Sequence, residues 1–394
     1  MNTIPTQTHA GSTPASRIFH HLHHAGSGKT KRELSEELHL SLPTVYQALS
    51  ALMAENLVEE RADRSSTGGR PASSFYVKAD GYFALGVSAT GSLLRTAVCD
   101  LIGNEIETSE MPMPLAGEAG EVARHVRQAA LDLLAAQAHA GRAIVGVGIA
   151  LPAIIDPRTQ DIVNARPLGF GHAEGKLFTA GMPCPVRLLN DANSGGYAET
   201  MEGPAGAEPV MRNAAFLSLE RGVGGALLVG GIPYEGANGR SGEFGHLCVE
   251  PGGRACTCGK RGCLQAYCSI DCLAGEATGA NDSPHESGPA FADLGTFFAA
   301  LAAGNQAAQA TWESFAEHLA RGIADIRMMF DADVIIGGML APDRQPWLED
   351  IRSRTLELCP FDRDASFVQL ARHPRFGIPL GAARQVMAAY TAKI

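Results

Sequence analysis

The feature that most constrains this chain is a dense group of thiol and imidazole side chains in GHLCVEPGGRACTCGKRGC, from Gly245 to Cys263. Cys256, Cys258 and Cys263 fall within eight positions, and His246 stands ten residues before the first of them. Structural zinc takes four nitrogen or sulfur ligands in a tetrahedron, and these residues supply one imidazole and three sulfurs. The spacing therefore predicts a structural zinc site. Ordinary buried thiols would rarely lie so close together, and a redox pair would need C-x-x-C spacing.

The remaining cysteines have no ligand-like spacing, so we expect them to be packing residues in the interior. They are Cys99, Cys184, Cys248, Cys268, Cys272 and Cys359. The first residues, MNTIPTQTHAGSTPAS, are polar and lack the apolar segment of a secretory signal, and no run of about 18 apolar residues predicts a membrane helix. We therefore expect a cytoplasmic protein without a disulfide framework.

The composition is that of a globular protein with a sizeable core, because 45% of the 394 residues are hydrophobic. A chain of this length has room for two or three domains. Its formal net charge of −10 argues against indiscriminate nucleic-acid binding by the whole chain. The same charge does not exclude one small DNA-binding module.

Residues 17–60 have the pattern of three short helices. Thr30 and Glu33 form a capping-box pattern at the start of KRELSEEL. Ser41 can cap the third helix, and Pro43 suits its first turn because an N–H would have no helical partner there. The apolar residues of this third helix share one face at helical spacing. They are Val45, Ala48, Leu49 and Leu52.

The opposite face of the third helix is polar, with Thr44 and Gln47 on it and Tyr46 at its flank. A turn-rich, basic segment follows, and its tip is the sequence GGRP around Arg70. These features predict a winged helix-turn-helix. Its short polar side chains could reach base edges in the major groove, where Gln can bond adenine, and Arg70 could enter a narrow minor groove. A three-helix protein-interaction module is the alternative.

From about residue 81 the pattern changes to strands that alternate with helices, which predicts an α/β domain. A strand, a glycine-bearing turn and a second strand occur in residues 83–106 and again in residues 214–230. This repeat suggests a duplicated fold of two lobes with a ligand-binding cleft between them.

The sequence GEFGHLCVEPGGRACTCGKRGC closely resembles the zinc signature of the ROK family, the group of bacterial sugar kinases and transcriptional repressors. The LNDAN stretch, the GVGGALLVGG turn and the VIIGG strand fall in the family's order, and the N-terminal module is similar to that of the repressor branch. The resemblance covers nearly the whole chain. It implies an actin-like (RNase H-like), two-lobed sugar-kinase fold that assembles as a homodimer or homotetramer.

We expect the following organisation on this basis. A disordered tail covers residues 1–15, the winged helix-turn-helix domain covers 16–80, the first lobe covers 81–195 together with a C-terminal helix at 377–394, and the second lobe with the zinc site covers 196–376.

The resemblance also implies a ligand site. Contacts to a sugar or sugar phosphate are implied at Asn190, Asp191, Glu243 and His246, and zinc ligands at His246, Cys256, Cys258 and Cys263. Paired donors and acceptors suit hydroxyl groups, and a histidine that binds zinc through one nitrogen can donate from the other. From spacing alone, Asn190 and Asp191 could equally cap a helix.

Several positions depart from the pattern of the family's kinases. Ser88 stands where the first phosphate turn carries an aspartate, and Glu220 would place a carboxylate beside phosphate oxygens at the second turn. We expect the bulk of Arg221 to fill space that a backbone cradle for phosphate needs. Gln265 replaces the glutamate that follows the last zinc cysteine, and we expect it to contact the sugar with a changed preference.

These departures favour a sugar-responsive transcriptional regulator, a repressor that binds operator DNA, and argue against an enzyme. In a kinase, Asp191 would be the general base. Two alternatives stay open: an ATP-dependent sugar kinase with a DNA-binding appendage, and a repressor that answers to a protein partner.

Overall fold

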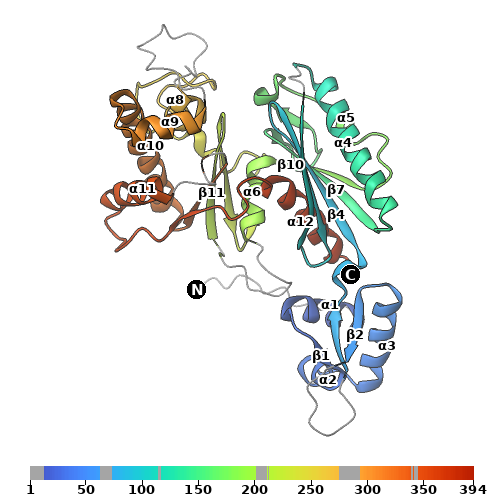
Figure 1. Ribbon diagram of the computed structural model, residues 1–394. Helices are drawn as coiled ribbons and strands as arrows, with labels where there is room; N and C mark the ends of the chain where they lie inside the picture. Colours follow the sequence, from blue (N-terminus) through green and yellow to red (C-terminus); the bar gives the residue numbers. More distant parts are fainter. Residues whose placement is uncertain are drawn as a thin grey trace.

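The computed structural model describes residues 13–62, 73–113, 117–200, 211, 213–274, 293–338, 340 and 345–394. The chain forms a small N-terminal module and two α/β lobes, with helices α6 (Asp191–Thr200) and α12 (Gly377–Thr391) between the two sheets (Figure 1). In the part of the chain that the structure describes, no helix is both long enough and apolar enough to span a membrane.

The N-terminal module consists of three helices and a small sheet. Its elements are α1 (Pro14–Ala25), β1 (Lys29–Thr30), α2 (Lys31–Leu38), α3 (Leu42–Ala54), β2 (Val58–Ala62) and β3 (Ser73–Val77), with strand order β1-β3-β2. The capping box of Thr30 and Glu33 is present, and the Ser41 hydroxyl accepts the N–H of Thr44. Thr13 caps α1, which therefore begins inside the segment expected to be a tail.

This module shares one hydrophobic core with the first lobe. Phe19, Leu49 and Phe75 belong to the same buried cluster as Leu101 of the first lobe and Met387 of α12. The Tyr82 hydroxyl donates to the carbonyl of Glu55 at the end of α3, at 3.0 Å, and the Tyr82 ring lies 5.2 Å from that of Tyr390. The short η1 (Ala79–Gly81) is the covalent connection.

The first lobe is built on a five-stranded sheet in the order β10-β7-β4-β5-β6. These strands are β4 (Phe83–Ala89), β5 (Leu93–Asp100), β6 (Glu105–Pro112), β7 (Ile144–Leu151) and β10 (Val186–Asn190). The helices α4 (Ala119–His139) and α5 (Lys176–Thr179) lie on the outer side of this sheet, and α12 lies on the side toward the second lobe (Figure 1). A short hairpin, β8 (Ile154–Ile155) and β9 (Ile162–Asn164), and η2 (Arg166–Leu168) lie between β7 and α5 in the chain.

The second lobe has a five-stranded sheet in the order β13-β12-β11-β14-β15. Its strands are β11 (Asn213–Leu219), β12 (Val223–Val229), β13 (Ile232–Pro233), β14 (Asp333–Gly338) and β15 (Val368–Leu370). The helices are α7 (Gln265–Cys268), α8 (Ile270–Ala274), α9 (Leu294–Ala302), α10 (Gln306–Phe330) and α11 (Gln345–Leu358). In both lobes an antiparallel hairpin, β4–β5 or β11–β12, pairs with a parallel strand, β7 or β14. The predicted duplicated, two-lobed α/β fold is confirmed.

The two central helices pack closely because glycine allows it. A Cβ on Gly381 of α12 would lie 1.7 Å from the carbonyl oxygen of Ser194 in α6. At the far end of α6, the buried Glu199 carboxylate accepts the backbone N–H groups of Arg372 and His373 at 2.8 and 2.9 Å. The helix that begins at Asp191 is therefore fixed both to α12 and to the segment that leads into it.

Candidate functional site

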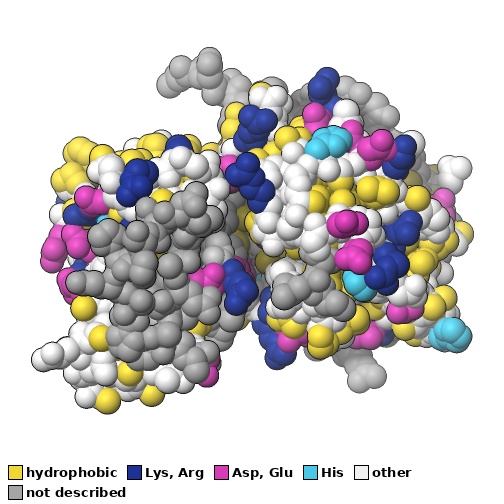
Figure 2. Space-filling view, turned by 90° about the horizontal axis from the view of Figure 1, so that it is seen from above, with side chains coloured by type: hydrophobic (Ala, Val, Ile, Leu, Met, Phe, Trp, Pro, Cys, Tyr) yellow, Lys and Arg dark blue, Asp and Glu magenta, His cyan; other side chains and the backbone are white. Residues whose placement is uncertain are grey.

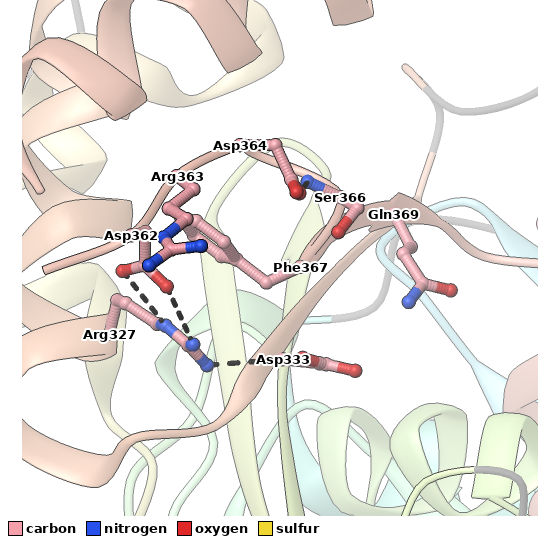
Figure 3. A pocket seen from close by; sticks show the side chains of 8 residues that line it. All are labelled: Arg327, Asp333, Asp362, Arg363, Asp364, Ser366, Phe367 and Gln369. Carbon is pink, nitrogen blue, oxygen red and sulfur yellow. Dashed lines mark hydrogen bonds and ion pairs between the residues drawn. The ribbon is translucent and has the colours of Figure 1, made fainter.

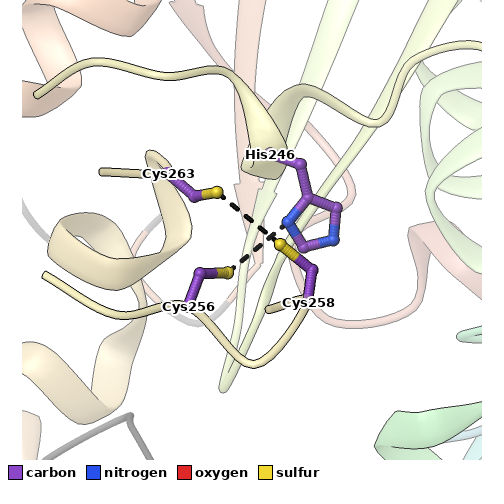
Figure 4. A group of neighbouring side chains, drawn as sticks. All are labelled: His246, Cys256, Cys258 and Cys263. Carbon is purple, nitrogen blue, oxygen red and sulfur yellow. Dashed lines mark hydrogen bonds between the residues drawn. The ribbon is translucent and has the colours of Figure 1, made fainter. Parts of the chain in front are cut away.

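The four expected metal ligands lie together beside η3 (Phe244–His246), as Figure 4 shows. The Cys256 sulfur is 3.6 Å from Nδ1 of His246, the Cys258 and Cys263 sulfurs are 3.7 Å apart, and all four ligand atoms lie within 4.8 Å of one another. Around an ion with Zn–S bonds of about 2.3 Å, two sulfurs of a tetrahedron would be about 3.8 Å apart. The residues therefore fit a four-coordinate metal site.

The loop that carries these cysteines turns where glycine permits it. Gly262 has φ +80°, and a Cβ there would lie 1.8 Å from the carbonyl oxygen of Glu250. The N–H of Cys256 donates to the carbonyl of Lys260, and the N–H of Gly259 donates to the carbonyl of Cys256, both at 2.9 Å. This tight turn brings sulfurs from both of its arms to one point.

The ring of His246 presents its two nitrogens to different neighbours. Nδ1 faces the cysteines, whereas Nε2 lies 4.0 Å from a carboxylate oxygen of Glu243. A metal on Nδ1 would leave the ring proton on Nε2, so that Nε2 would be a hydrogen-bond donor beside Glu243. This geometry agrees with the two roles expected of His246 from the sequence.

Asn190 and Asp191 stand where β10 runs into α6. The Asn190 side chain caps the helix, because its oxygen accepts the N–H of Asn193 at 2.9 Å, and its amide donates to the carbonyl of Ala153 at 3.1 Å. The Asp191 carboxylate accepts the N–H of the adjacent Ala192 at 2.8 Å, and burial raises the pKa of Asp191 to about 6. The capping alternative thus describes Asn190, while Asp191 is the more available of the two for a ligand.

Two further carboxylates from the second lobe interact electrostatically with Asp191. Burial raises the pKa of Glu243, and the charge of Asp191 adds to the effect. Burial also raises the pKa of Glu220 to about 7, with Arg95 opposing the shift and Asp191 adding to it. The charge of Asp191 on α6 therefore acts on carboxylates of the β11–β12 turn and of the segment before η3.

Gln265 is held by partners within its own lobe. Its carbonyl oxygen accepts the N–H of Val223 at 3.3 Å, and its amide donates to the Thr257 hydroxyl at 3.2 Å. Across the cleft, Arg166 of the first lobe donates to the backbone carbonyl of Thr257 at 3.3 Å. Gln265 thus ties the metal loop to the β11–β12 turn, and its contact to a sugar stays a prediction.

In Figure 2, Lys and Arg side chains lie along the line where the lobes meet.

An ionic network that the sequence analysis missed joins β5, β6 and the segment before α12. Ser88 is buried in β4 and pairs in register with Arg95 of β5. Arg95 contacts Glu110 of β6 at 2.6 Å, and Glu110 also contacts Arg375, just before α12, at 3.0 Å. No local pattern could reveal it, because Glu110 and Arg375 are 265 positions apart.

The expectation for Arg221 was wrong. Its side chain is 76% exposed and lies 3.7 Å from Asp271 at the start of α8, so it does not fill the turn. The β11–β12 turn instead carries the half-buried Glu220, whose backbone carbonyl accepts the N–H of Ile270 at 2.9 Å.

Three of the residues expected to contact DNA lie on α3. Tyr46 and Gln47 are exposed, with Tyr46 at 53%, and the Lys31 ammonium lies 4.1 Å from the centre of the Tyr46 ring. Thr44 is half-buried, and its hydroxyl lies 2.7 Å from that of Ser41 as part of the helix cap. Arg70 lies outside the described residues.

A hollow of about 380 Å³ lies on the second lobe beside β14 and β15 (Figure 3). Arg327 crosses it and forms ion pairs with Asp362 at 2.8 Å and with Asp333 at 3.9 Å. The lining includes none of the residues expected to bind sugar, metal or DNA.

Comparisons with known proteins identify the family to which this chain is similar. The ROK family model matches residues 84–373, well over half of the chain. A xylose repressor from Bacillus spizizenii is 29% identical over 250 residues, which is 62% of each chain, so the match spans less than two thirds of the repressor. An N-acetylmannosamine kinase from Escherichia coli O157:H7 is 31% identical over 259 residues, 64% of this chain and 82% of the kinase.

Two solved structures extend the likeness. A ROK hexokinase from Thermus thermophilus has a TM-score of 0.63 and 26% identity, and the match covers 79% of this chain and 99% of the hexokinase. A ROK family transcriptional regulator described as a homologue of the E. coli MLC protein has a TM-score of 0.74, and the match covers 96% of each chain. At 19% identity this second likeness concerns the fold alone. From the family match over residues 84–373, the chain belongs to the ROK family.

Proposed function

We propose that this protein is a sugar-responsive, DNA-binding transcriptional regulator that acts as a repressor and has no kinase activity. The observation that carries the proposal is the N-terminal module, whose exposed α3 residues and capped helices are joined by a common core to a two-lobed ROK body. The similarity to xylose repressors over 250 residues supports it.

In this proposal α3 enters the major groove of an operator, with Gln47 on adenine and Tyr46 and Thr44 beside it, while Arg70 reaches the minor groove. Two copies of the chain would bind a pseudo-palindromic operator, since a symmetric dimer matches a symmetric site. Gln47→Ala should then weaken operator binding by about 1–3 kcal/mol and relax selectivity at one base pair. Equal weakening on unrelated DNA would assign Gln47 to the backbone instead.

The cofactor in this proposal is one structural zinc ion, held by His246, Cys256, Cys258 and Cys263. The 3.6 and 3.7 Å separations of their ligand atoms support it. Zinc would supply rigidity to the loop and fix the tautomer of His246, whose Nε2 would then donate to a sugar hydroxyl. Asp191 and Glu243 would accept from other hydroxyls of the same sugar.

A sugar held between Asp191 on α6 and Glu243 with His246 in the second lobe would favour one arrangement of the lobes over others. Only such differential binding shifts a conformational equilibrium. Since α6 packs on α12, and α12 shares a core with the N-terminal module, a change at the cleft would alter the placement of the two α3 helices in a dimer. A small misfit on half-sites one helical turn apart weakens binding.

The test is operator affinity with and without sugar. Because the effector is unidentified, a panel of sugars and sugar phosphates is first screened by thermal shift, since a ligand of the folded state raises the melting temperature. The sugar should lower operator affinity of the wild type, and Asp191→Ala should remove this response while sugar-free binding is kept. Asp132→Ala, an exposed aspartate on α4, is the matched control. If Asp191→Ala responds like the wild type, the pocket is not the sensor and a protein partner takes its place.

A second candidate is an ATP-dependent sugar kinase. It is favoured by Asp191, the position of the family's general base, because burial raises its pKa to about 6 and a base works best near the operating pH. The 31% identity to an N-acetylmannosamine kinase is consistent with it. Formation of ADP from ATP and magnesium with any sugar of the panel separates the two candidates.

A further inference from the structure

Cys248 differs from the other cysteines outside the metal cluster. It was expected to pack in the interior, but its side chain is exposed. Cys99, Cys268 and Cys359 are buried, and Cys184 and Cys272 are half-buried. Cys248 follows His246 by two positions and is not one of the four clustered ligands.

Cys248 lies directly opposite Cys263 in a short antiparallel bridge. The flanking hydrogen bonds run from the N–H of Leu264 to the carbonyl of Leu247 and from the N–H of Val249 to the carbonyl of Gly262, both at 2.8 Å. The two cysteines are therefore a non-hydrogen-bonded pair, in which the Cα atoms are about 4.5 Å apart and the side chains are on the same face. Disulfides span Cα separations of about 4.4–6.8 Å, so the backbone already permits a bond.

The thiol of Cys248 leans toward the strand that carries Cys263. Its sulfur lies 3.9 Å from the carbonyl oxygen of Arg261, and 3.4 Å from the place that a Cβ on Gly262 would take. Because residue 262 is a glycine, no side chain at that position separates the thiol from its neighbour. The geometry therefore brings an exposed thiol to the edge of the metal cluster.

We propose that Cys248 is an oxidation site, at which a peroxide-class oxidant forms a disulfide between Cys248 and Cys263 and thereby releases the metal. The release of zinc rests on the zinc site of the proposed function, whereas the disulfide rests on the register of the two cysteines alone. Cys248 is thus a redox control on the sugar side of the cleft.

The chemistry is balanced in two steps. The Cys248 thiol attacks hydrogen peroxide, the O–O bond breaks, and the products are a Cys248 sulfenic acid and one water. The Cys263 sulfur then attacks the Cys248 sulfur, the S–S bond forms, and the S–O bond breaks, so that hydroxide leaves and is protonated to a second water. Two thiol groups lose two electrons in total, and peroxide gains them.

Loss of Cys263 as a ligand would leave three groups for an ion that prefers four. His246 would lose the metal ion that orients its ring. The loop around Thr257 would also lose the metal that holds it in place, and Thr257 accepts hydrogen bonds from Arg166 and Gln265. Oxidation is therefore expected to disturb the sugar contacts before it disturbs the N-terminal module, which shares its core with the first lobe.

The experiment uses the full chain loaded with zinc. Zinc content is measured first, and hydrogen peroxide is then added to the wild type, to Cys248→Ser and to the control Cys184→Ser, which changes a half-buried cysteine of the first lobe. Zinc release is followed with a metal-binding dye, and disulfides are mapped by peptide mass spectrometry without reduction.

The wild type and Cys184→Ser should release zinc about tenfold faster than Cys248→Ser, because reactivity follows the accessible thiol. The peptides of Cys248 and Cys263 should be joined, and a reducing agent with added zinc should restore the starting state. Equal release rates in all three proteins, or disulfides that omit the pair, would overturn the inference. If the untreated protein holds no zinc, the zinc proposal fails, and peptide mapping alone then decides on the disulfide.

Discussion

The two sides of the proposed cleft differ in how their residues compare with those expected of the family's kinases. On the side expected to bind sugar, Asp191, Glu243 and His246 are the residue types that the resemblance implies, and the ligand atoms of His246 and the three clustered cysteines lie within 4.8 Å of one another. On the side expected to bind phosphate in a kinase, Ser88 and Glu220 depart from the residue types that the resemblance implies. Near Ser88, Arg95, Glu110 and Arg375 form an ionic network. If the proposed function is right, one scaffold keeps the means to recognise a sugar while the means to activate a phosphate are altered.

Electrostatics accounts for this expected difference between sugar recognition and phosphate binding. Neutral hydroxyl groups are good donors to carboxylates, so Asp191 and Glu243 suit the sugar of the proposed function. Ionised carboxylates would repel the charged oxygens of ATP, and Glu220 would do so increasingly as the pH rises through its pKa of about 7.

The largest expected effect comes from breaking the metal cluster. Cys258→Ala should remove the bound zinc and unfold or strongly destabilise the second lobe, because structural zinc contributes on the order of 10 kcal/mol, comparable to the stability of a whole domain. Elemental analysis and calorimetry measure both effects, with Cys272→Ala as the control. A metal-free variant that stays folded and binds sugar would contradict the zinc assignment.

The next effect concerns phosphoryl transfer. The wild type should turn over more slowly than about 1 per second with ATP, magnesium and any sugar of the panel. The double change Ser88→Asp with Glu220→Thr should raise ADP formation above the wild type, because it removes a carboxylate near the phosphates and restores one for the metal ion. Wild-type turnover above that limit would mean that the protein still transfers phosphate, and that Ser88 and Glu220 have not removed this function.

The third effect is a dependence of stability on pH. The pKa of Glu220 is raised from 4.5 to about 7 on folding, so its contribution to stability is complete below about pH 4.5 and is lost as the pH rises through about 7. Glu220→Gln should therefore raise the free energy of unfolding at pH 8 by about 1–2 kcal/mol and change it little at pH 4.5. Urea unfolding at the two pH values checks this, and an equal gain at both would assign the effect to something other than titration.

The smallest effect concerns the link between the lobes. Arg166→Ala removes the hydrogen bond to the Thr257 carbonyl, and an exposed contact of this kind contributes about 0.5–1 kcal/mol. Sugar affinity should fall about two- to fivefold, which titration calorimetry resolves. Arg158→Ala, an exposed arginine of the same lobe, should leave the affinity unchanged. A similar loss in both variants would point to general charge rather than to this bond.

Much of the fold could be predicted because its signals are local. The capping box at Thr30, the cap at Ser41 and the glycine turns around the cysteines each depend on residues a few positions apart, and all are present. The helix cap by Asn190 was weighed as an alternative and is observed. The contacts that join distant segments could not be predicted in this way.

Three features of the structure could not be predicted from local sequence patterns. Glu110 meets Arg375 only because β6 and the start of α12 come together in the folded chain. Arg221 turns outward because Asp271 stands at the start of a helix that no sequence pattern placed beside it. Cys248 is exposed although it lies opposite the buried Cys263, and a cysteine's usual preference for the interior gave the opposite expectation.

The common core of the N-terminal module and the first lobe also has a consequence for how the protein unfolds. Apolar residues of α1, α3 and β3 lie in one buried cluster with residues of β5 and α12, so separating the module would expose apolar surface on both pieces. We therefore expect the module to have no independent melting transition and to unfold together with the first lobe as one cooperative unit. A fragment cut after Lys78 would therefore lose the apolar contacts with the first lobe and α12, and a genetic transplant of the N-terminal module would need to carry the end of the chain with it.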